Sequence, residues 1–309
     1  MDTGNSRVTF SRLGEFGQFG NQLFQISGTI GIAASLGLEV TLPAWRYRHH
    51  FPALPESYFS REQNSGAIID AAYLCYQRLG YDACLYMQDP TLWANCEQRV
   101  LTYLTPSLSV FDRVEGPALD ALRLISDESR TCIALHVRRG DYINSSSHVV
   151  LPMDYYRRAL SIVGPGEIIV FTDDREWCLR NFEWCLPRVV VSSPSAIIDF
   201  VLMTQCDRHV IANSTFSWWA SYLARSDRVV MPDSWFTASE PRRLELSSRL
   251  RFRQSIQVGY DEDDTDGRVD GRGADVSSTR RGQRGAVKRL AFLEAALEEL
   301  ILAVRREGS

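Results

Sequence analysis

The sequence lacks the features that mark secreted, membrane-spanning and metal-binding proteins. Residues 1–17 contain neither the basic region nor the apolar core of a signal peptide, and no apolar run approaches the length of a membrane span. The seven cysteines are scattered, odd in number and without a Cys-x-x-Cys pair, which indicates reduced thiols and offers no zinc framework. We therefore expect a cytoplasmic protein with no membrane span and no metal site.

A large excess of charge of either sign is also lacking. The formal net charge is −4 and the pI is about 5.8, which argues against a broadly basic binding face and predicts no nucleic-acid partner. An anionic ligand must then be bound by a local group of basic side chains. Apolar material is ample, because 309 residues that are 45% hydrophobic and 11% aromatic can fill the cores of two domains.

The composition changes sharply after Tyr260. Residues 261–285 are almost entirely charged, small polar or glycine, which predicts a disordered linker over 258–286. A short amphipathic helix is expected at 287–306, where one stripe carries Leu290, Leu293, Leu297, Leu300 and Val304. Two heptads are too few for an independent coiled coil, so this helix is expected either to dock on the body or to mediate self-association.

Strands and helices alternate through the second half of the chain. We expect helices at 152–163, 195–206 and 218–225, a short helix after 174, and strands at 132–137, 168–174, 188–191, 208–212 and 228–232. This alternation predicts an α/β fold with a doubly wound parallel sheet. In the first half we expect a strand at 8–13, a helix stopped by Gly37, a strand at 39–43, and mostly helix over 66–124 with a short strand at 85–88.

The most informative stretch is TCIALHVRRGDY at 131–142. A non-alternating apolar run predicts a strand buried on both faces, and His136, Arg138, Arg139 and Asp141 come where it ends. Arg-Gly-Asp also occurs in cell-adhesion loops, and the His and Asp spacing occurs in kinase catalytic loops, but neither context is present here. A salt-bridge network that pins the turn is the ordinary structural alternative to ligand binding.

Two further strand ends are polar, which favours a ligand site over an isolated ion-pair network. Asp173 follows one strand and Asn213 follows another. In open α/β sheets ligands bind outside the carboxyl ends of the strands. Hydroxyls at a helix start suit an anion, as Ser214, Thr215 and Ser217 would provide. For a nucleotide, Asp173 suits a ribose hydroxyl and Asp199 suits guanine NH groups, whereas capping and turn formation are the structural alternatives.

A glycine-rich turn joins the first strand to the first helix. Gly17 and Gly20 are spaced by three residues, which is not the dinucleotide fingerprint, and a tight turn alone would explain them. Such a turn also lets the backbone approach a ligand closely, with Asn21 and Gln22 at the helix start as donors.

Six motifs together carry a resemblance to a known family. They are GxxGNQxFQ at 17–25, HVRRGDY at 136–142, LPxxYY at 151–156, FTDDxxW at 171–177, DFxLMxxC at 199–206 and NSTFSWWASYL at 213–223. Over roughly residues 8 to 236 the chain resembles the α-1,2-fucosyltransferases of glycosyltransferase family 11. Gln18 departs from the pattern, because the family generally has a second glycine there.

The resemblance implies a GT-B architecture, with an acceptor-side Rossmann-like domain at 1–127 and a donor-binding one at 128–257. It also implies an inverting, metal-independent transfer of L-fucose from GDP-L-fucose to a galactose-containing glycan, at the 2-hydroxyl of galactose. No cofactor is expected, and a site near the inner membrane face, where glycans are assembled, is the expected location. Another linkage or acceptor, or a catalytically idle binding module, are the alternatives.

The resemblance also assigns roles to individual residues. Arg138 resembles the arginine that binds the donor β-phosphate, with His136 beside it, Asp141 bracing Arg138 and Arg139, and Asn21 approaching from the opposite domain. Asp199 resembles the guanine-binding carboxylate, and Asp173 would line the nucleotide site. The remaining donor-site residues would be Gly17, Gly20, Gln22, Arg139, Asn213, Ser214, Thr215 and Ser217. The general base stays open among His136, Glu15, His148 and Asp154.

Overall fold

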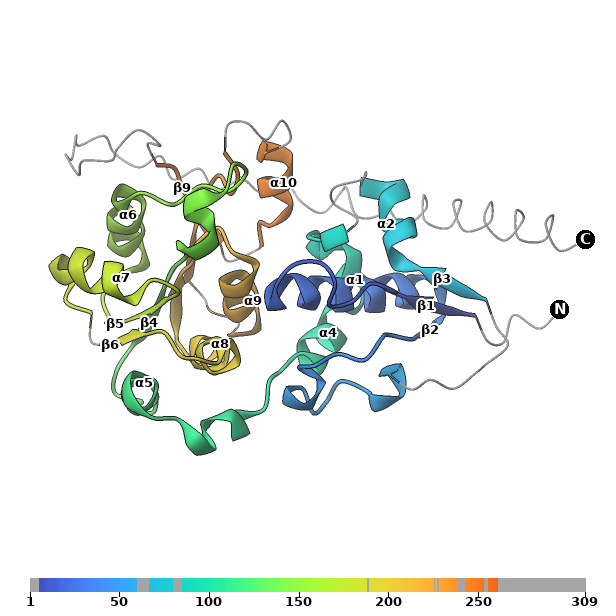
Figure 1. Cartoon of the computed structure of the whole chain (residues 1–309), viewed down its shortest axis with the longest axis horizontal. Helices are drawn as coiled ribbons and strands as arrows, with labels where there is room; N and C mark the ends of the chain where they lie inside the picture. Colours follow the sequence, from blue (N-terminus) through green and yellow to red (C-terminus); the bar gives the residue numbers. More distant parts are fainter. Residues whose placement is uncertain are drawn as a thin grey trace, which may run out of the picture.

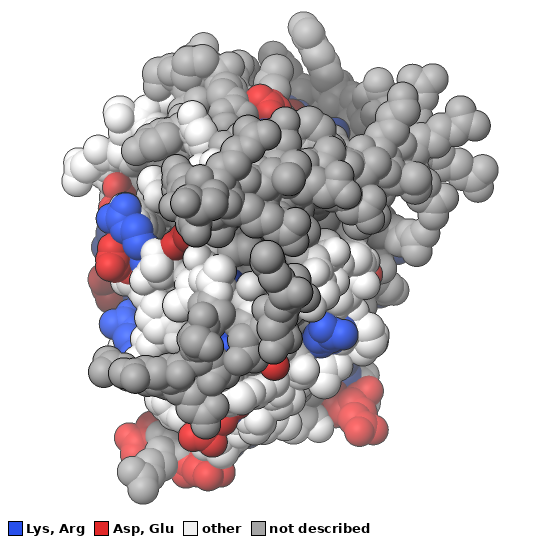
Figure 2. Space-filling view, turned by 90° about the vertical axis from the view of Figure 1, so that its right-hand side faces the viewer, with Lys and Arg blue, Asp and Glu red and all other residues white. Residues whose placement is uncertain are grey.

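The structure is a computed structural model that describes residues 6–59, 67–79, 85–187, 189–224, 226, 228–237, 243–252 and 255–260. The predicted linker from 261 onward and the predicted C-terminal helix lie outside these residues. Within them, no helix is both long and apolar enough to cross a membrane. On the face shown in Figure 2, basic and acidic side chains of the described residues lie scattered among uncharged ones.

The larger of two sheets has six parallel strands, in the spatial order β6-β5-β4-β7-β8-β9. Its strands are β4 (Cys132–Val137), β5 (Glu167–Thr172), β6 (Val189–Val191), β7 (Arg208–Val210), β8 (Arg228–Pro232) and β9 (Ser255–Val258). Counted from the first strand of the sheet, this order is 3-2-1-4-5-6, the order of the Rossmann fold. The prediction of an α/β protein with a parallel sheet is confirmed.

Helices cover both faces of this sheet (Figure 1). One face packs against α6 (Met153–Val163) and α7 (Arg175–Asn181), and the other against α5 (Gly116–Ile125), α8 (Ala196–Thr204) and α9 (Thr215–Ala224). Every residue of β4 is buried. Two covered faces explain why the sequence of this strand shows no alternation.

The smaller sheet has three parallel strands in the order β2-β1-β3. Its strands are β1 (Arg7–Thr9), β2 (Glu39–Val40) and β3 (Ile68–Asp70), and the nearby helices are α1 (Phe19–Leu36), α2 (Ala71–Leu79) and α4 (Glu97–Tyr103). Helix α1 ends as predicted, because Gly37 adopts a left-handed φ of 65° and its N–H reaches the carbonyls of Ala33 and Ala34. The remaining helices are η1 (Arg48–His50), η2 (Glu56–Phe59), η3 (Pro90–Cys96), η4 (Leu108–Arg113), η5 (Gly140–Asn144), η6 (Glu183–Cys185) and α10 (Arg243–Arg249).

Helix α1 joins the two sheets through one hydrophobic cluster. The Phe24 ring lies 4.7 Å from Trp218 and 5.2 Å from Trp219, both on α9. Aromatic residues bury the most area per side chain, so these contacts hold the amino-terminal half firmly against the larger sheet.

Four local predictions differ from the structure. Residues 68–70 form β3 rather than helix, because Ile68 and Ile69 pair with β1 in a strand too short to show a period. The strand predicted at 85–88 is absent, since Met87 has a φ of 51° that breaks an extended chain. Helix α9 starts at Thr215 rather than 218, and β9, which was not predicted, runs to Val258, one residue into the predicted linker. The boundary at 127/128 stays a prediction.

Candidate active site

The candidate site lies where the order of the large sheet reverses, at the carboxyl ends of β4 and β7. In doubly wound sheets this switch point opens a crevice in which ligands bind. Arg138 and Arg139 follow β4 directly, and Asn213 comes three residues after β7. The strand ends that the sequence marked as polar therefore meet at one edge of the sheet.

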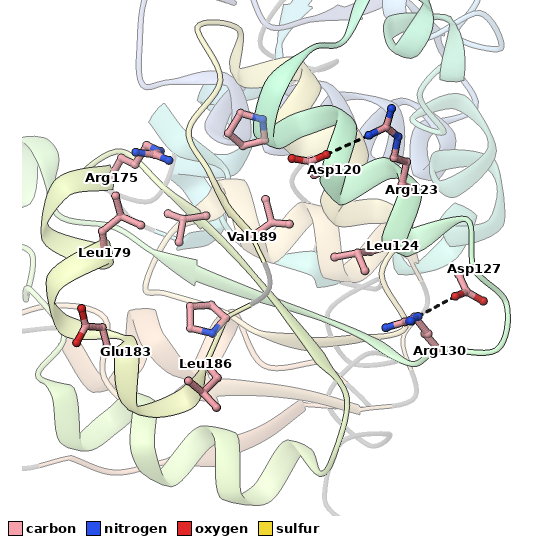
Figure 3. A pocket seen from close by; sticks show the side chains of 13 residues that line it. Asp120, Arg123, Leu124, Asp127, Arg130, Arg175, Leu179, Glu183, Leu186 and Val189 are labelled. Carbon is pink, nitrogen blue, oxygen red and sulfur yellow. Dashed lines mark hydrogen bonds and ion pairs between the residues drawn. The ribbon is translucent and has the colours of Figure 1, made fainter.

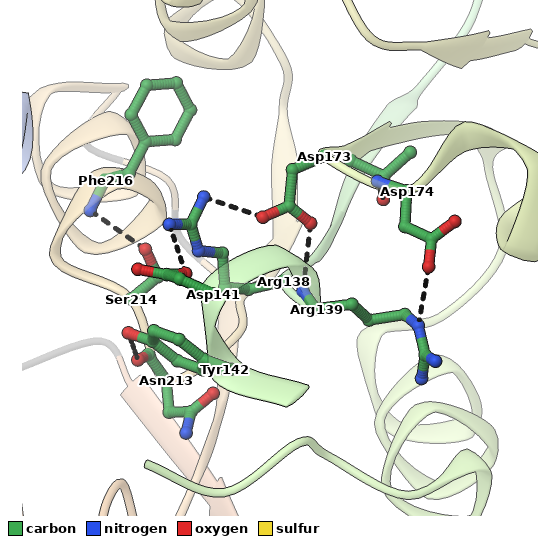
Figure 4. A network of polar contacts seen from close by, with 10 residues as sticks. Arg138, Arg139, Asp141, Tyr142, Asp173, Asp174, Asn213, Ser214 and Phe216 are labelled. Carbon is green, nitrogen blue, oxygen red and sulfur yellow. Dashed lines mark hydrogen bonds and ion pairs between the residues drawn. The ribbon is translucent and has the colours of Figure 1, made fainter. Parts of the chain in front are cut away.

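Arg138 stands between two carboxylates (Figure 4). Its Nη2 lies 2.6 Å from Asp141 Oδ1, and its Nη1 lies 2.7 Å from Asp173 Oδ2. The Arg138 side chain is 26% exposed and the Asp141 side chain 64% exposed, so Asp173 is the more sheltered partner. The guanidinium is thus oriented by the protein while keeping contact with solvent, as an arginine that grips an anion requires.

Arg139 is held on the other side of Asp173. Its backbone N–H donates to Asp173 Oδ1 at 2.9 Å, its Nε lies 3.1 Å from Asp174 Oδ2, and its guanidinium carbon lies 3.9 Å above the Trp177 ring. Through its backbone N–H, its Nε and its stacking on Trp177, Arg139 helps to fix the turn. Trp177 was not among the predicted site residues, although it is the last residue of the FTDDxxW motif.

Gly140 lets this turn close. A Cβ atom at this position would lie 2.6 Å from Asp173 Oδ2. A side chain at position 140 would therefore push on the Asp173 carboxylate that holds Arg138, a role of the HVRRGDY glycine that was not predicted.

His136 lies on β4 beneath the charged loop. It is 5% exposed, and its ring centre lies 5.6 Å from that of Phe216. Burial lowers the pKa of His136 to about 3, with the nearby Arg138 adding to the shift. The imidazole is neutral at physiological pH, and its Nδ1 has no hydrogen-bond partner among the described residues.

The hydroxyls at the start of α9 differ in what they leave open. Ser214 caps the helix, because its Oγ accepts the N–H of Phe216 at 3.4 Å. Ser217 is fully buried, and its Oγ lies 3.3 Å from the Ser214 carbonyl and 3.5 Å from that of Ala212. Thr215 is half-buried at the first turn. Of the three hydroxyls, Thr215 is the one best placed for a ligand.

The start of α1 lies directly against the start of α9. A Cβ atom on Gly20 would lie 2.5 Å from the backbone carbon of Thr215. Only a glycine permits this approach, which brings together two helix N-termini and their partial positive charges. Gly17 has a φ of 70°, and its backbone lies against the Asn21 side chain.

Asn21 and Gln22 have different roles in the structure. Gln88 Nε2 donates to Asn21 Oδ1 at 2.7 Å, which leaves the Nδ2 donors of Asn21 for a ligand. No sequence motif pointed to Gln88. Gln22 is buried, accepts from Trp45 Nε1 at 2.9 Å and donates to the Gly17 carbonyl at 3.2 Å, so it supports the turn rather than reaching a ligand.

Asp199 lies in the first turn of α8. Its two oxygens accept from the backbone N–H of Ser193 at 3.3 and 3.1 Å. The residue is 8% exposed, and burial raises the pKa of Asp199 to about 6 although the hydrogen bonds from Ser193 oppose the shift. A carboxylate so poorly solvated has unused acceptor capacity for paired NH donors.

The candidates for the general base differ in their partners: two are paired with arginines, whereas His148 contacts a serine hydroxyl. Glu15 pairs with Arg12 at 2.8 Å and Asp154 with Arg158 at 2.7 Å. Nδ1 of His148 lies 3.0 Å from the Ser147 hydroxyl, and its ring lies 4.6 Å from that of Tyr142. The assignment of the base stays open.

A separate groove of about 1160 Å³ lies along α5, α7 and the β6 edge (Figure 3). Asp120 pairs with Arg123 and Asp127 with Arg130 on its wall, and Leu179 and Leu186 line it. None of the predicted site residues lines this groove.

Over the part of the chain that the structure describes, no group of three or more His, Cys, Asp or Glu side chains could hold a metal ion.

Comparison with known proteins shows similarity to one family of glycosyltransferases over the residues of this site. A sequence profile described as Glycosyl transferase family 11 matches residues 113–248. The O-antigen biosynthesis glycosyltransferase WbnK of Escherichia coli is 33% identical over 186 residues, which are 56% of this chain and 61% of that protein. Galactoside alpha-(1,2)-fucosyltransferase 1 of Leontocebus fuscicollis is 27% identical over 253 residues, 71% of this chain and 68% of that protein.

Among solved structures, the fucosyltransferase NodZ from Bradyrhizobium is 16% identical with a TM-score of 0.44, over 73% of this chain and 94% of that one. A TM-score this low does not establish a shared architecture. The profile match spans the loop with both arginines, Asp173, Asp199 and the start of α9. The predicted resemblance to the fucosyltransferases of glycosyltransferase family 11 is thereby confirmed over this part of the chain.

Proposed function

We propose that this protein transfers L-fucose from GDP-L-fucose to a glycan, at the 2-hydroxyl of a galactose, with inversion and without a metal ion. The observation that carries the proposal is the position of Arg138 at the switch point of a 3-2-1-4-5-6 sheet, held by Asp173 and open to solvent. The relatives support fucose transfer and the linkage, since one is named a galactoside alpha-(1,2)-fucosyltransferase.

In the proposed donor complex, the diphosphate lies between Arg138 and the start of α9. Three carboxylates surround the two arginines in the free protein, so an incoming diphosphate must take the place of one of them. Asp141 is the most exposed of these side chains and the easiest to displace, whereas Asp173 stays to orient the guanidinium. Thr215 and the joined N-termini of α1 and α9 add donors from the other side.

The chemistry is a direct displacement at the anomeric carbon of fucose. The acceptor oxygen forms the new bond, the bond to the β-phosphate oxygen breaks, and the acceptor proton leaves to a base. Negative charge grows on the departing GDP, where Arg138 stabilises it. Neutral His136 adds no competing charge under this centre.

The remaining features of the proposal concern binding and setting. Asp199 binds the guanine NH groups, Asn21 reaches the donor from the amino-terminal half, and the two parallel sheets correspond to the halves of a GT-B enzyme. The glycan acceptor binds on the amino-terminal side. A cytoplasmic location at the inner membrane face and self-association through residues 287–306 complete the proposal.

Acceptor-dependent GDP release tests this function. We expect the full chain to release GDP from GDP-L-fucose in the presence of EDTA when a galactose-terminated acceptor is added, and NMR of the product to show fucose α-linked to the 2-hydroxyl. Release that needs a divalent cation, or a product with another linkage, would contradict that part of the proposal. GDP binding without turnover on any acceptor would favour the idle binding module.

A further inference from the structure

Asn213 connects three segments at the carboxyl edge of the large sheet. Its Nδ2 donates to the carbonyl of Val149 at 2.8 Å and to that of Trp235 at 2.9 Å. Val149 belongs to the arginine loop, residues 138–149, and Trp235 to the β8 loop, residues 233–237. One amide therefore links the loops that follow β4 and β8 to the residue that follows β7.

A second connection runs through the backbone of Asn213. Its carbonyl accepts the Tyr142 hydroxyl at 3.0 Å, as Figure 4 shows. The guanidinium carbon of Arg138 lies 5.4 Å from the centre of the Tyr142 ring. The arginine loop is thus attached to Asn213 at two points, Tyr142 near its middle and Val149 at its end.

The burial of Asn213 rules out an ordinary ligand contact through its amide nitrogen. The residue is 1% exposed, and both hydrogens of Nδ2 are used within the protein. Its Oδ1 is buried and unpaired among the described residues. A role in holding the two loops fits these contacts better than the donor-binding role that the family resemblance implied.

Asn213 is followed directly by Ser214 and Thr215, where α9 begins. Asn213 therefore lies between Arg138 and the start of α9, the two groups that would bind the diphosphate from opposite sides. We propose that Asn213 is a positioning residue that fixes the arginine loop, and with it Arg138, relative to the start of α9. The expected effect on catalysis rests on the proposed function. The expected effect on the two loops rests on the hydrogen bonds of Asn213 alone.

Kinetics of an Asn213→Ala variant give the first test. We expect kcat to fall about 10- to 100-fold, because a displacement of about 1 Å at the reacting groups has that effect, while the Kd for GDP changes less than about threefold. Tyr142→Phe, which leaves the buried amide intact, should lower kcat less, and the double variant should fall short of the product of the two effects. Ser226→Ala is the matched control, since it removes a buried hydrogen bond to His209 at the opposite edge.

Two kinetic outcomes would overturn the inference. In the first, kcat of Asn213→Ala is no lower than that of Ser226→Ala. In the second, Kd for GDP rises in proportion to the loss of kcat, which would make Asn213 a donor contact.

Hydrogen exchange provides a readout that needs no activity. In Asn213→Ala, the amides of residues 138–149 and 233–237 should exchange faster than in wild type, and in Ser226→Ala they should not. Unchanged exchange in both loops would overturn the inference. If wild-type protein failed to bind GDP while exchange rose as expected, the proposed function would fail and the positioning role would stand.

Discussion

Polar groups have different partners at the two ends of the parallel strands of the large sheet, called here the amino edge and the carboxyl edge. At the amino edge, polar side chains are paired within the protein: the Cys132 N–H donates to Asp207, the ring of His209 bridges the Met203 carbonyl and the Ser226 hydroxyl, and Arg208 Nη1 donates to the carbonyls of Val163 and Pro165. At the carboxyl edge, Arg138 faces solvent between two acids. The polar groups named at the amino ends of the strands are thus paired within the protein, whereas Arg138 at the carboxyl ends keeps contact with solvent.

This difference shows how a charged strand end can be judged. Arg208 is the first residue of β7, whereas Arg138 directly follows the last residue of β4, so the two arginines lie at opposite ends of neighbouring strands. Arg208 caps the carboxyl end of α6, where a cation is stabilised by the helix dipole. Arg138 has no such carbonyl partner among the described residues, and its partners are carboxylates that an anion can replace.

Replacing these two arginines should separate the two ends of the sheet most clearly, because one change should lower activity and the other stability. Arg138→Ala should lower kcat/KM for transfer about a thousandfold, because the leaving diphosphate loses its charged stabiliser. Arg208→Ala should lower the melting temperature and leave kcat/KM within about twofold of wild type. Steady-state rates and thermal unfolding check both. Transfer by a folded Arg138→Ala variant at more than a tenth of the wild-type rate would contradict the assignment.

Asp173→Asn should have the next largest effect. The change removes the charge that holds Arg138 Nη1 but keeps an oxygen for the Arg139 N–H, so we expect kcat/KM to fall about 10- to 100-fold with the fold retained. Asp120→Asn, in an exposed pair with Arg123, is the control and should change activity little. Equal rates for the two variants would show that Asp173 is not needed to orient Arg138.

Asp199 should make nucleoside binding depend on pH. Since burial raises the pKa of Asp199 to about 6, affinity for guanosine should fall about tenfold per pH unit below 6, and Asp199→Asn should bind weakly with no such dependence. Guanosine avoids the titration of the phosphate. Affinity that stays constant from pH 7 to pH 5 in wild type would contradict the guanine role.

Asp199 should also cost stability. A folded pKa above the unfolded value means that the folded protein binds more protons, so the free energy of unfolding falls as pH rises from about 4 to about 6. Asp199→Asn should therefore be more stable than wild type at pH 7, by about 1–2 kcal/mol in urea unfolding. A less stable variant would indicate that the carboxylate is needed for folding.

The smallest effect is expected at the amino edge. Ser226→Ala should lower the free energy of unfolding by about 1 kcal/mol and leave transfer unchanged. Burial lowers the pKa of His209 to about 4, so the unfolded chain takes up a proton that the folded one does not. Wild-type stability should thus decrease as pH falls from 6.5 towards 4, and replacement of His209 by Gln should flatten this part of the profile.

Much of the large sheet could be predicted, because most of its strands are rich in apolar residues and several are followed directly by polar ones. The pairing of Arg138 with Asp173 could not, since strand order is set by packing across the sheet and not by neighbours in the sequence. β3 escaped prediction for a related reason: three residues carry no period, and its strand character comes from pairing with β1.

The sequence indicates which polar residue types lie near the site, but it does not indicate which of their polar atoms are already buried or hydrogen-bonded within the protein. Gln22, Ser217 and Asn213 carry the groups expected of ligand donors, yet their polar atoms are largely buried or used within the protein. Gly20 matched a motif, but its function is to let α1 meet α9. Burial and hydrogen-bond partners depend on tertiary contacts, which the sequence does not contain.

Hydrogen exchange with and without GDP tests the contrast between the two edges most directly. We predict that GDP slows exchange at residues 138–149, 172–175 and 213–217, and leaves residues 130–132 and 206–209 unchanged. Protection at the amino edge, or none at the carboxyl edge when GDP is bound, would contradict the placement of the nucleotide at the switch point.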